Sequence, residues 1–127
     1  MIIESAIRKT IIEDSGVKNI TTQCHFNYIP QAPTYPLIVL QRVTGSRVHH
    51  LGGPSGAARP RFQIESWAET YDAAKSLANL IRVALDGKEH TQDGITFSCL
   101  SQAEIDGYED AVGVHRIIQD YSVRYTE

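Results

Sequence analysis

Apolar and polar residues recur along the chain with two different periods, and these periods predict its helices and strands. Between residues 3 and 15, apolar side chains return every three or four positions, which predicts an amphipathic helix. Gly16 is expected to end this helix, because glycine adopts a left-handed backbone without steric cost. A second helix is predicted over residues 71–85, with Thr70 as its N-cap and Gly87 just after its end. Each helix has one apolar stripe and therefore needs a partner surface.

Strands are predicted where the alternation has a period of two, or where a short run is apolar throughout. The segments are residues 22–29, 36–44, 61–68, 94–103 and 113–126. Residues 37–40 are apolar on both faces, which is typical of a central strand. Ile95, Phe97 and Cys99 are expected to point inward, and Asp106 and Gly107 are expected to form the turn before the last strand.

The predicted order of elements is α-β-β-β-α-β-β. Because strands outnumber the helices available for crossover connections, we expect an α+β fold, with a mainly antiparallel sheet of four to five strands packed with two helices. Residues 1–127 are expected to form a single domain. Residues 45–60 contain glycines and two prolines but no periodicity, which predicts a long loop that is mobile or functional.

Composition narrows the classes of protein that fit. With 42% hydrophobic and 21% charged residues, the chain has a globular composition. Its net charge of −3 argues against a protein whose main task is to bind nucleic acid. Cys24 and Cys99 are expected to be reduced and buried, and a single disulfide is the alternative. Since residues 37–40 form the longest apolar run and no signal-peptide pattern is visible, we expect synthesis in the cytosol and no membrane segment.

No constellation of residues predicts catalysis. His49 and His50 are adjacent, so their rings point to opposite sides of an extended chain, and no third ligand has a metal-site spacing. The glycines of residues 52–56 lack the Gly-Lys-Ser/Thr ending of a phosphate loop. Four carboxylates near the end of the chain are interpreted as a solvated acidic turn: Glu104, Asp106, Glu109 and Asp110. We therefore expect no enzyme activity, metal, cofactor or small-molecule substrate.

Basic residues gather in and next to the predicted loop, in an otherwise acidic chain. They are Arg47, His49, His50, Arg59 and Arg61. Two interpretations are open: an ordinary solvated surface, or a contact surface for a partner or for passing DNA.

Three aromatic residues are further candidates for contacts between subunits or with partners. Trp67 lies on the otherwise polar face of its predicted strand, where it either anchors an interface or is covered by the first helix. Tyr121 and Tyr125 share one face of the last predicted strand with Ile117 and Val123, and the same question applies to them.

The ordered set of segments resembles a known family. A proline-rich approach over residues 30–36 leads into the strand at 37–43 and the glycine-rich segment, and the closing strand begins at residues 113–118. The most specific element is a strand that ends in Trp67-Ala68 and runs into an alanine-rich helix. Over nearly its whole length the chain is similar to the tail completion (tail terminator, head-to-tail joining) proteins of tailed bacteriophages and prophages.

This resemblance implies a structural subunit of the virion tail, made in the host cytoplasm, with no catalytic residues. It implies a ring, typically of six copies, that caps the tail tube and meets the head-connector proteins while double-stranded DNA passes through. Residues 45–60 would then become ordered against a neighbouring subunit or the tail tube. A globular domain of this length is roughly 32–36 Å across, so six copies leave a hole of similar width, which admits a duplex of about 20 Å.

Two other classes of protein fit the predicted fold. A small-molecule or regulatory binding domain with a ferredoxin-like α+β fold would have a closed apolar pocket within one subunit. An enzyme would need a cleft with perturbed titratable groups.

Overall fold

The computed structural model describes residues 2–44, 47–50 and 53–126, and side chains at 47–50 and 53–57 lie outside this description. The described chain contains three helices and eight strands. The helices are α1 (Ile3–Glu13), α2 (Ser15–Lys18) and α3 (Tyr71–Leu85). The strands are β1 (Cys24–Phe26), β2 (Leu37–Thr44), β3 (Arg47–His50), β4 (Gly53–Ala58), β5 (Arg61–Ala68), β6 (Lys88–Gln92), β7 (Ile95–Glu109) and β8 (Val114–Thr126).

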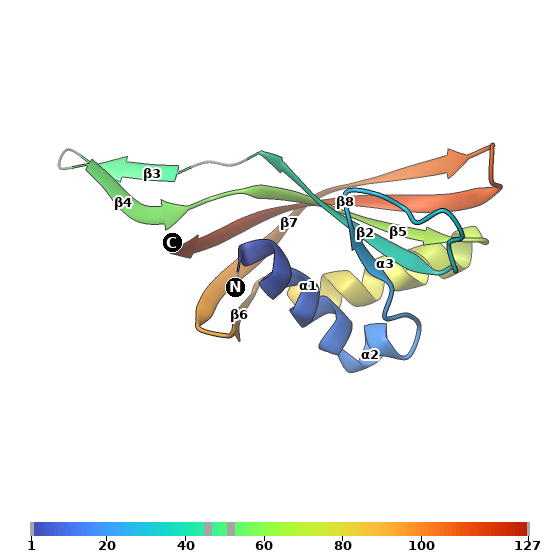
Figure 1. Cartoon of the computed structure of the whole chain (residues 1–127), viewed down its shortest axis with the longest axis horizontal. Helices are drawn as coiled ribbons and strands as arrows, with labels where there is room; N and C mark the ends of the chain where they lie inside the picture. The colour runs from blue at the N-terminus through green and yellow to red at the C-terminus, as the bar shows by residue number, and fades with distance from the viewer. Residues whose placement is uncertain (1, 45–46, 51–52, 127) are drawn as a thin grey trace.

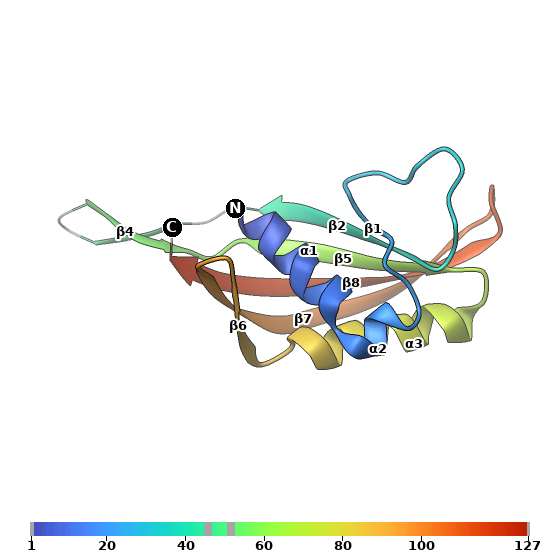
Figure 2. The same ribbon diagram turned by 60° about the horizontal axis from the view of Figure 1, so that its bottom comes forward.

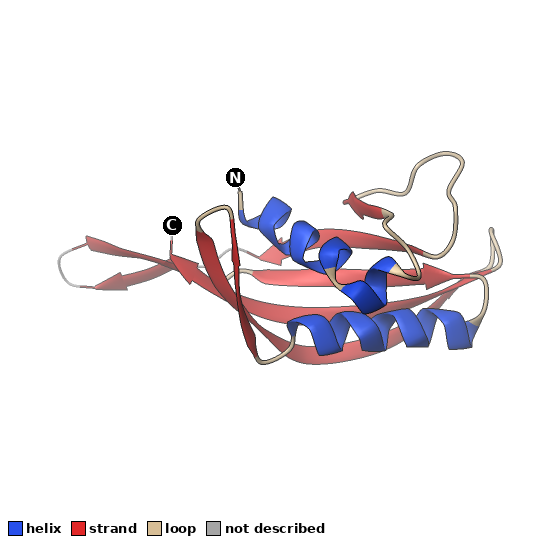
Figure 3. Cartoon of the chain, turned by 90° about the horizontal axis from the view of Figure 1, so that it is seen from below, coloured by secondary structure: helices blue, strands red, loops and turns tan. Residues whose placement is uncertain are grey.

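The strands form one curved sheet, and the helices cover one of its faces (Figures 1 and 3). The order is β1-β2-β5-β8-β4-β3, with β7 along the other side of β8 and β6 beside β7. The pair β1–β2 is parallel and the other pairs are antiparallel. The predicted α+β class is confirmed, and the sheet is mixed.

The numbers of strands and helices differ from the prediction for identifiable reasons. The segment expected to be an irregular loop contains the hairpin β3–β4. Strand β6 was missed, although Asp93 and Gly94 both have positive φ (47° and 87°), as two-residue hairpin turns require. The predicted strand at 22–29 is only three residues long, because Asn27 adopts a φ of 64° and turns the chain away.

The expected stop of the first helix at Gly16 is wrong. Helix α1 ends at Glu13, and Asp14 starts the short helix α2 by accepting a hydrogen bond from the Val17 backbone N–H at 3.1 Å. Gly16 lies inside α2, where an added Cβ would come within 3.1 Å of Leu80 Cδ2. Its lack of a side chain therefore lets α2 approach α3 closely.

The prediction of a turn at Asp106–Gly107 is also wrong, because β7 continues through both residues. Ser101 lies opposite Tyr121 and Ala103 lies opposite Asp120, so one extra residue is inserted between them in β7. This β-bulge reverses the alternation: odd-numbered residues face the helices before it and even-numbered residues face them after it. The turn follows β7, with Gly113 at a φ of 67°.

The main core lies between the helices and the sheet. Its largest fully buried side chains come from both layers: Ile7, Ile11, Leu77 and Ile81 from the helices, and Ile38, Leu40, Phe62, Ile64, Phe97 and Tyr121 from the sheet. Burial of these side chains is the main stabilising contribution. Cys24 and Cys99 are free thiols in this core, as predicted, and burial raises the pKa of each to about 12.

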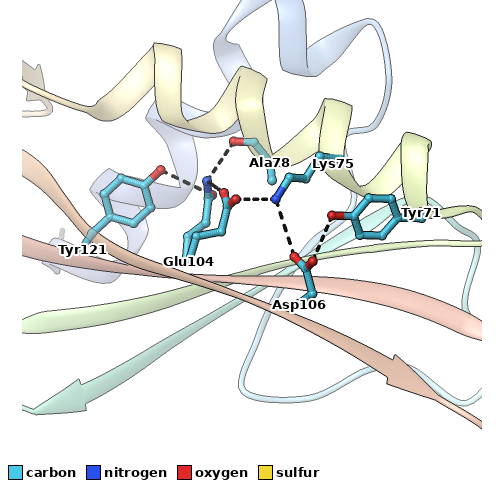
Figure 4. A network of polar contacts seen from close by, with 7 residues as sticks. Tyr71, Lys75, Ala78, Glu104, Asp106 and Tyr121 are labelled. Carbon is cyan, nitrogen blue, oxygen red and sulfur yellow. Dashed lines mark hydrogen bonds and ion pairs between the residues drawn. The ribbon is translucent and has the colours of Figure 1, made fainter.

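Helix α3 begins where predicted, because the Thr70 hydroxyl accepts a hydrogen bond from the Ala73 backbone N–H at 3.2 Å. A polar network then ties this helix to β7 and β8 (Figure 4). Lys75 forms ion pairs with Glu104 and Asp106. The Tyr71 hydroxyl donates to Asp106 at 2.9 Å, which raises the pKa of Tyr71, and the hydrogen bond from Lys75 to Glu104 raises the pKa of Lys75.

The buried end of this network is centred on Gln119, which is 1% exposed. Its Nε2 donates to the Ala78 carbonyl at 3.1 Å and to Glu104 at 3.0 Å, while its Oε1 accepts from the Tyr121 hydroxyl at 3.3 Å. Two of the acidic residues interpreted as a solvated turn, Glu104 and Asp106, are therefore strand residues that attach the sheet to α3.

The raised thiol pKa values predict slow chemistry at both cysteines. Since the thiolate is the reactive form and both groups are buried, we expect neither Cys24 nor Cys99 to react with a thiol reagent in the native protein at pH 8. After denaturation both should react. With a reagent that releases a chromophore when it reacts with a thiol, absorbance measures the extent of reaction. Rapid reaction of either cysteine in the native protein would contradict the described core.

The network predicts unequal effects of two alanine substitutions. Gln119→Ala leaves the Ala78 carbonyl and the Tyr121 hydroxyl without partners in a buried site, so we expect a loss of about 1–3 kcal/mol in unfolding free energy. Lys75→Ala, its control at the exposed end, should cost less than about 1 kcal/mol. Urea denaturation followed by circular dichroism measures both, and equal effects would show that Gln119 is not the centre of the network.

Candidate assembly surfaces

The hairpin β3–β4 extends away from the body of the subunit (Figures 1 and 2). Within the described chain, β3 pairs with β4 alone, and β4 is joined to the sheet only where Ala57 and Ala58 lie opposite Thr126 and Tyr125 of β8. A two-stranded hairpin has little stability in water without further support. This hairpin is therefore a surface suited to a partner.

The predicted basic residues all lie on the hairpin or at its base. Arg47, His49 and His50 belong to β3, and their side chains fall outside the described residues. Arg59 is exposed directly after β4. Arg61 begins β5, where its Nη2 lies 3.7 Å from Asp120 Oδ2, so its charge is partly matched within the subunit.

A shallow groove of about 460 Å³ runs along the base of the hairpin. Arg59, Arg124 and Glu89 contribute charged groups to it, Tyr125 contributes aromatic surface, and the largely buried Phe97 reaches its wall. The structure thus brings together Arg59 and Tyr125, two residues singled out from distant parts of the sequence. Tyr121 is fully buried in the main core, which leaves its side chain no surface for a partner.

Trp67 lies on the sheet face opposite the helices, so the first helix does not cover it. It packs with Leu37, Val39 and Val114 and is 8% exposed. Ile29 and Tyr35, from the proline-rich connection between β1 and β2, pack against this cluster. The sequence left two alternatives for Trp67: an interface anchor, or a side chain covered by the first helix. In the structure, the proline-rich connection covers it instead.

The same end of the sheet contains a cleft of about 300 Å³. Its lining residues are mostly apolar: Ile29, Pro30, Gln31, Pro33, Tyr35, Trp67, Glu109, Ala111 and Val112. Beside it, the Arg116 guanidinium lies 5.5 Å from the centre of the Trp67 ring and within 3.3 Å of both Glu65 and Glu109. Burial raises the pKa of Glu65, and the charge of Arg116 opposes this shift. Arg116 thus forms structural ion pairs with both Glu65 and Glu109.

One edge of β7 forms a surface that the sequence analysis missed. Strand β6 pairs with β7 as far as Cys99, so beyond that residue β7 is paired along one side, with β8, among the strands that the structure describes. Residues 102–106 are all exposed, and the side chains of Ile105 and Tyr108 are 59% and 53% exposed. The alternation of acidic residues with Ile105 and Tyr108 over residues 104–110 is typical of a strand. The β-bulge shifts this alternation relative to residues 95–101, so the two parts did not read as one strand.

The described residues contain no group of three or more histidine, cysteine or acidic side chains placed to hold a metal ion. None of the helices in the described part of the chain is both long and apolar enough to cross a membrane. The grooves described above are open to solvent, unlike the closed apolar pocket that a small-molecule binding domain would have. The surfaces of this subunit are thus suited to contacts with other macromolecules.

Comparisons with known proteins agree with this conclusion. A chain in the solved structure "Virion of native gene transfer agent (GTA) particle" matches with a TM-score of 0.80 at 14% identity, over 98% of this chain and 95% of that one. At this identity the likeness shows a shared fold. No curated protein matches the sequence.

Residues 5–126 match the family model described as "Tail completion protein gp17". The match includes both helices of the predicted pattern and the strands between and after them, which confirms the resemblance drawn from the sequence. Because the match extends over nearly the whole chain, this protein belongs to the tail completion protein gp17 family and is a non-enzymatic structural protein of the virion tail.

Proposed function

We propose that this protein forms a ring at the head-proximal end of the tail, where it ends the tail tube and joins it to the head connector. The ring contains six copies and encloses a pore through which double-stranded DNA passes. The observation that carries the proposal is the hairpin β3–β4, which projects from the subunit at one end of its long axis and has so little contact with its own sheet (Figure 1).

A ring requires that each subunit present two different surfaces, one to each neighbour, because a ring is built by repeating one heterologous contact through a rotation that closes. This subunit has unlike ends. The hairpin lies at one end of the long axis, and the β1–β2 connection and the β7–β8 turn lie at the other (Figure 2). Residues of this connection and this turn line the cleft beside Trp67.

The charge of the subunit suits a DNA conduit. A pore rich in lysine and arginine would bind phosphate with release of counterions and would slow the movement of the genome. A net charge of −3 avoids strong retention of DNA by the ring as a whole.

Negative-stain electron microscopy of the purified protein at high concentration tests the ring. We expect rings with a central pore wide enough for duplex DNA, and gold-labelled antibody should mark the head-proximal end of assembled tails. Closed dimers at every concentration, or label along the whole tail, would overturn the proposal.

A hairpin-deletion variant tests whether β3–β4 is needed for assembly. Replacing residues 47–56 with a Gly-Ser-Gly linker removes the part of the hairpin that does not pair with β8. We expect the rest of the subunit to remain folded, with one cooperative thermal transition in circular dichroism, and rings to be lost. Rings that still form from this variant would show that the hairpin is not an assembly element.

A further inference from the structure

Charged residues are distributed very unevenly along this chain. Between residues 15 and 64 there are five lysines and arginines and no aspartate or glutamate: Lys18, Arg42, Arg47, Arg59 and Arg61. From residue 65 onward there are twelve acidic residues against five lysines and arginines. The segment without acids includes the whole of the β3–β4 hairpin.

The fold places the basic hairpin at one end of the molecule and a group of acids at the other, although Glu89 and Asp120 also lie near the base of the hairpin. The hairpin projects at one end of the long axis, and the β7–β8 turn lies at the other, near the start of α3 (Figures 1 and 2). Lys75 and Arg116 pair with four carboxylates there. Three more acids lie in or next to these elements and have no ion pair among the described residues: Glu69 before α3, Asp72 in α3 and Asp110 after β7. This end is therefore acidic after its internal pairs are counted.

The acidic end also has an unpaired strand edge. Pairing between β6 and β7 stops at Cys99. The backbone N–H of Ser101, which follows on the same edge of β7, donates to the Asp86 carboxylate at 2.8 Å. Beyond that point one edge of β7 has no strand partner in the described chain. Exposed strand edges pair readily with strands of another chain, and here the exposed Ile105 adds apolar surface.

We propose that the β3–β4 hairpin of one copy docks on residues 102–110 of a neighbouring copy, which comprise the unpaired edge of β7 and Asp110 directly after it. This inference rests on the proposed ring and names its subunit contact. The occupant is a second copy because the chain itself provides both complementary parts. One is a basic hairpin whose strand edges are largely unpaired among the described residues, and the other is an acidic strand edge. Since the two parts are different surfaces, the contact is heterologous, and it closes into a ring when the rotation between neighbouring copies divides a full turn.

Charge complementarity makes the contact sensitive to salt and to charge reversal. We expect association to weaken between about 0.05 M and 0.5 M salt, since exposed charges are screened over a few ångströms at high ionic strength. Arg47→Glu and Asp110→Arg should each weaken association about three- to tenfold, by replacing attraction with repulsion. A chain with both substitutions should recover, because the charges are then exchanged between the two surfaces.

Sedimentation velocity over a range of concentrations measures these associations. Lys18→Glu is the matched control: it changes the net charge by the same amount as Arg47→Glu, at an exposed site on α2. We expect the control to associate as the unmodified protein does. Equal weakening by the control, or no recovery in the doubly substituted chain, would overturn the proposed docking surface.

A photo-cross-link identifies the contact directly. With benzoylphenylalanine in place of Ser55 in β4, irradiation of assembled protein should give cross-linked dimers, and mass spectrometry should place the link in residues 102–110 of the second copy. The same group in place of Val83, which is 60% exposed on α3, serves as the control and should give no link to that segment.

The outcomes separate this inference from the proposed function. Rings whose hairpins cross-link to another segment, to added DNA or to a tail-tube protein would overturn the docking surface and leave the ring intact. Absence of both rings and cross-linked dimers at all concentrations would overturn the two proposals together.

Discussion

The pairing of strand β8 with its neighbours is the interaction on which the rest of the structure depends. This strand pairs with β5 and β4 along one side and with β7 along the other. Strand β8 lies between β5 and β7, which are far apart in sequence. It therefore joins the β2–β5 part of the sheet to the β6–β7 hairpin. Its buried residues Ile117, Gln119, Tyr121 and Val123 contact the helix layer, so the strand also links the sheet to the main core.

Coverage of only one sheet face by helices determines where the assembly surfaces lie. The apolar stripes of α1 and α3 are used inside the subunit. On the other face, the proline-rich connection covers Trp67 and its neighbours at one end, and charged side chains such as Arg61 and Asp120 occupy the remainder. Among the described residues, the candidate surfaces for partners are therefore at the ends and edges of the sheet: the hairpin, the cleft and the edge of β7 beyond Cys99. This arrangement suits a protein that repeats around an axis, in which contacts at two ends matter more than a pocket.

Much of the candidate surface was visible in the sequence, and the parts that were missed have physical reasons. Arg47, His49, His50 and Arg59 were recognised from their concentration in an acidic chain, and they do lie at one end of the molecule. Trp67 and Tyr121 could not be assigned correctly, because their covers come from residues far away in the chain: the connection between β1 and β2, and the helix layer. The edge of β7 was hidden by a single inserted residue, since a bulge shifts the alternation on which strand prediction relies.

The sequence by itself determined the α+β class, the second helix with its cap, the strands β2, β5 and β8, the buried thiols and the family. These depend on local signals, such as periodicity, capping and turn residues, that act over a few neighbouring positions. Tertiary structure alone decided the parallel pairing of β1, the cover over Trp67, the edge of β7 that is unpaired in the described chain, and the position of the hairpin at the end opposite the β7–β8 turn. The reason is that these features join residues distant in sequence, and no local pattern specifies which distant segments come together.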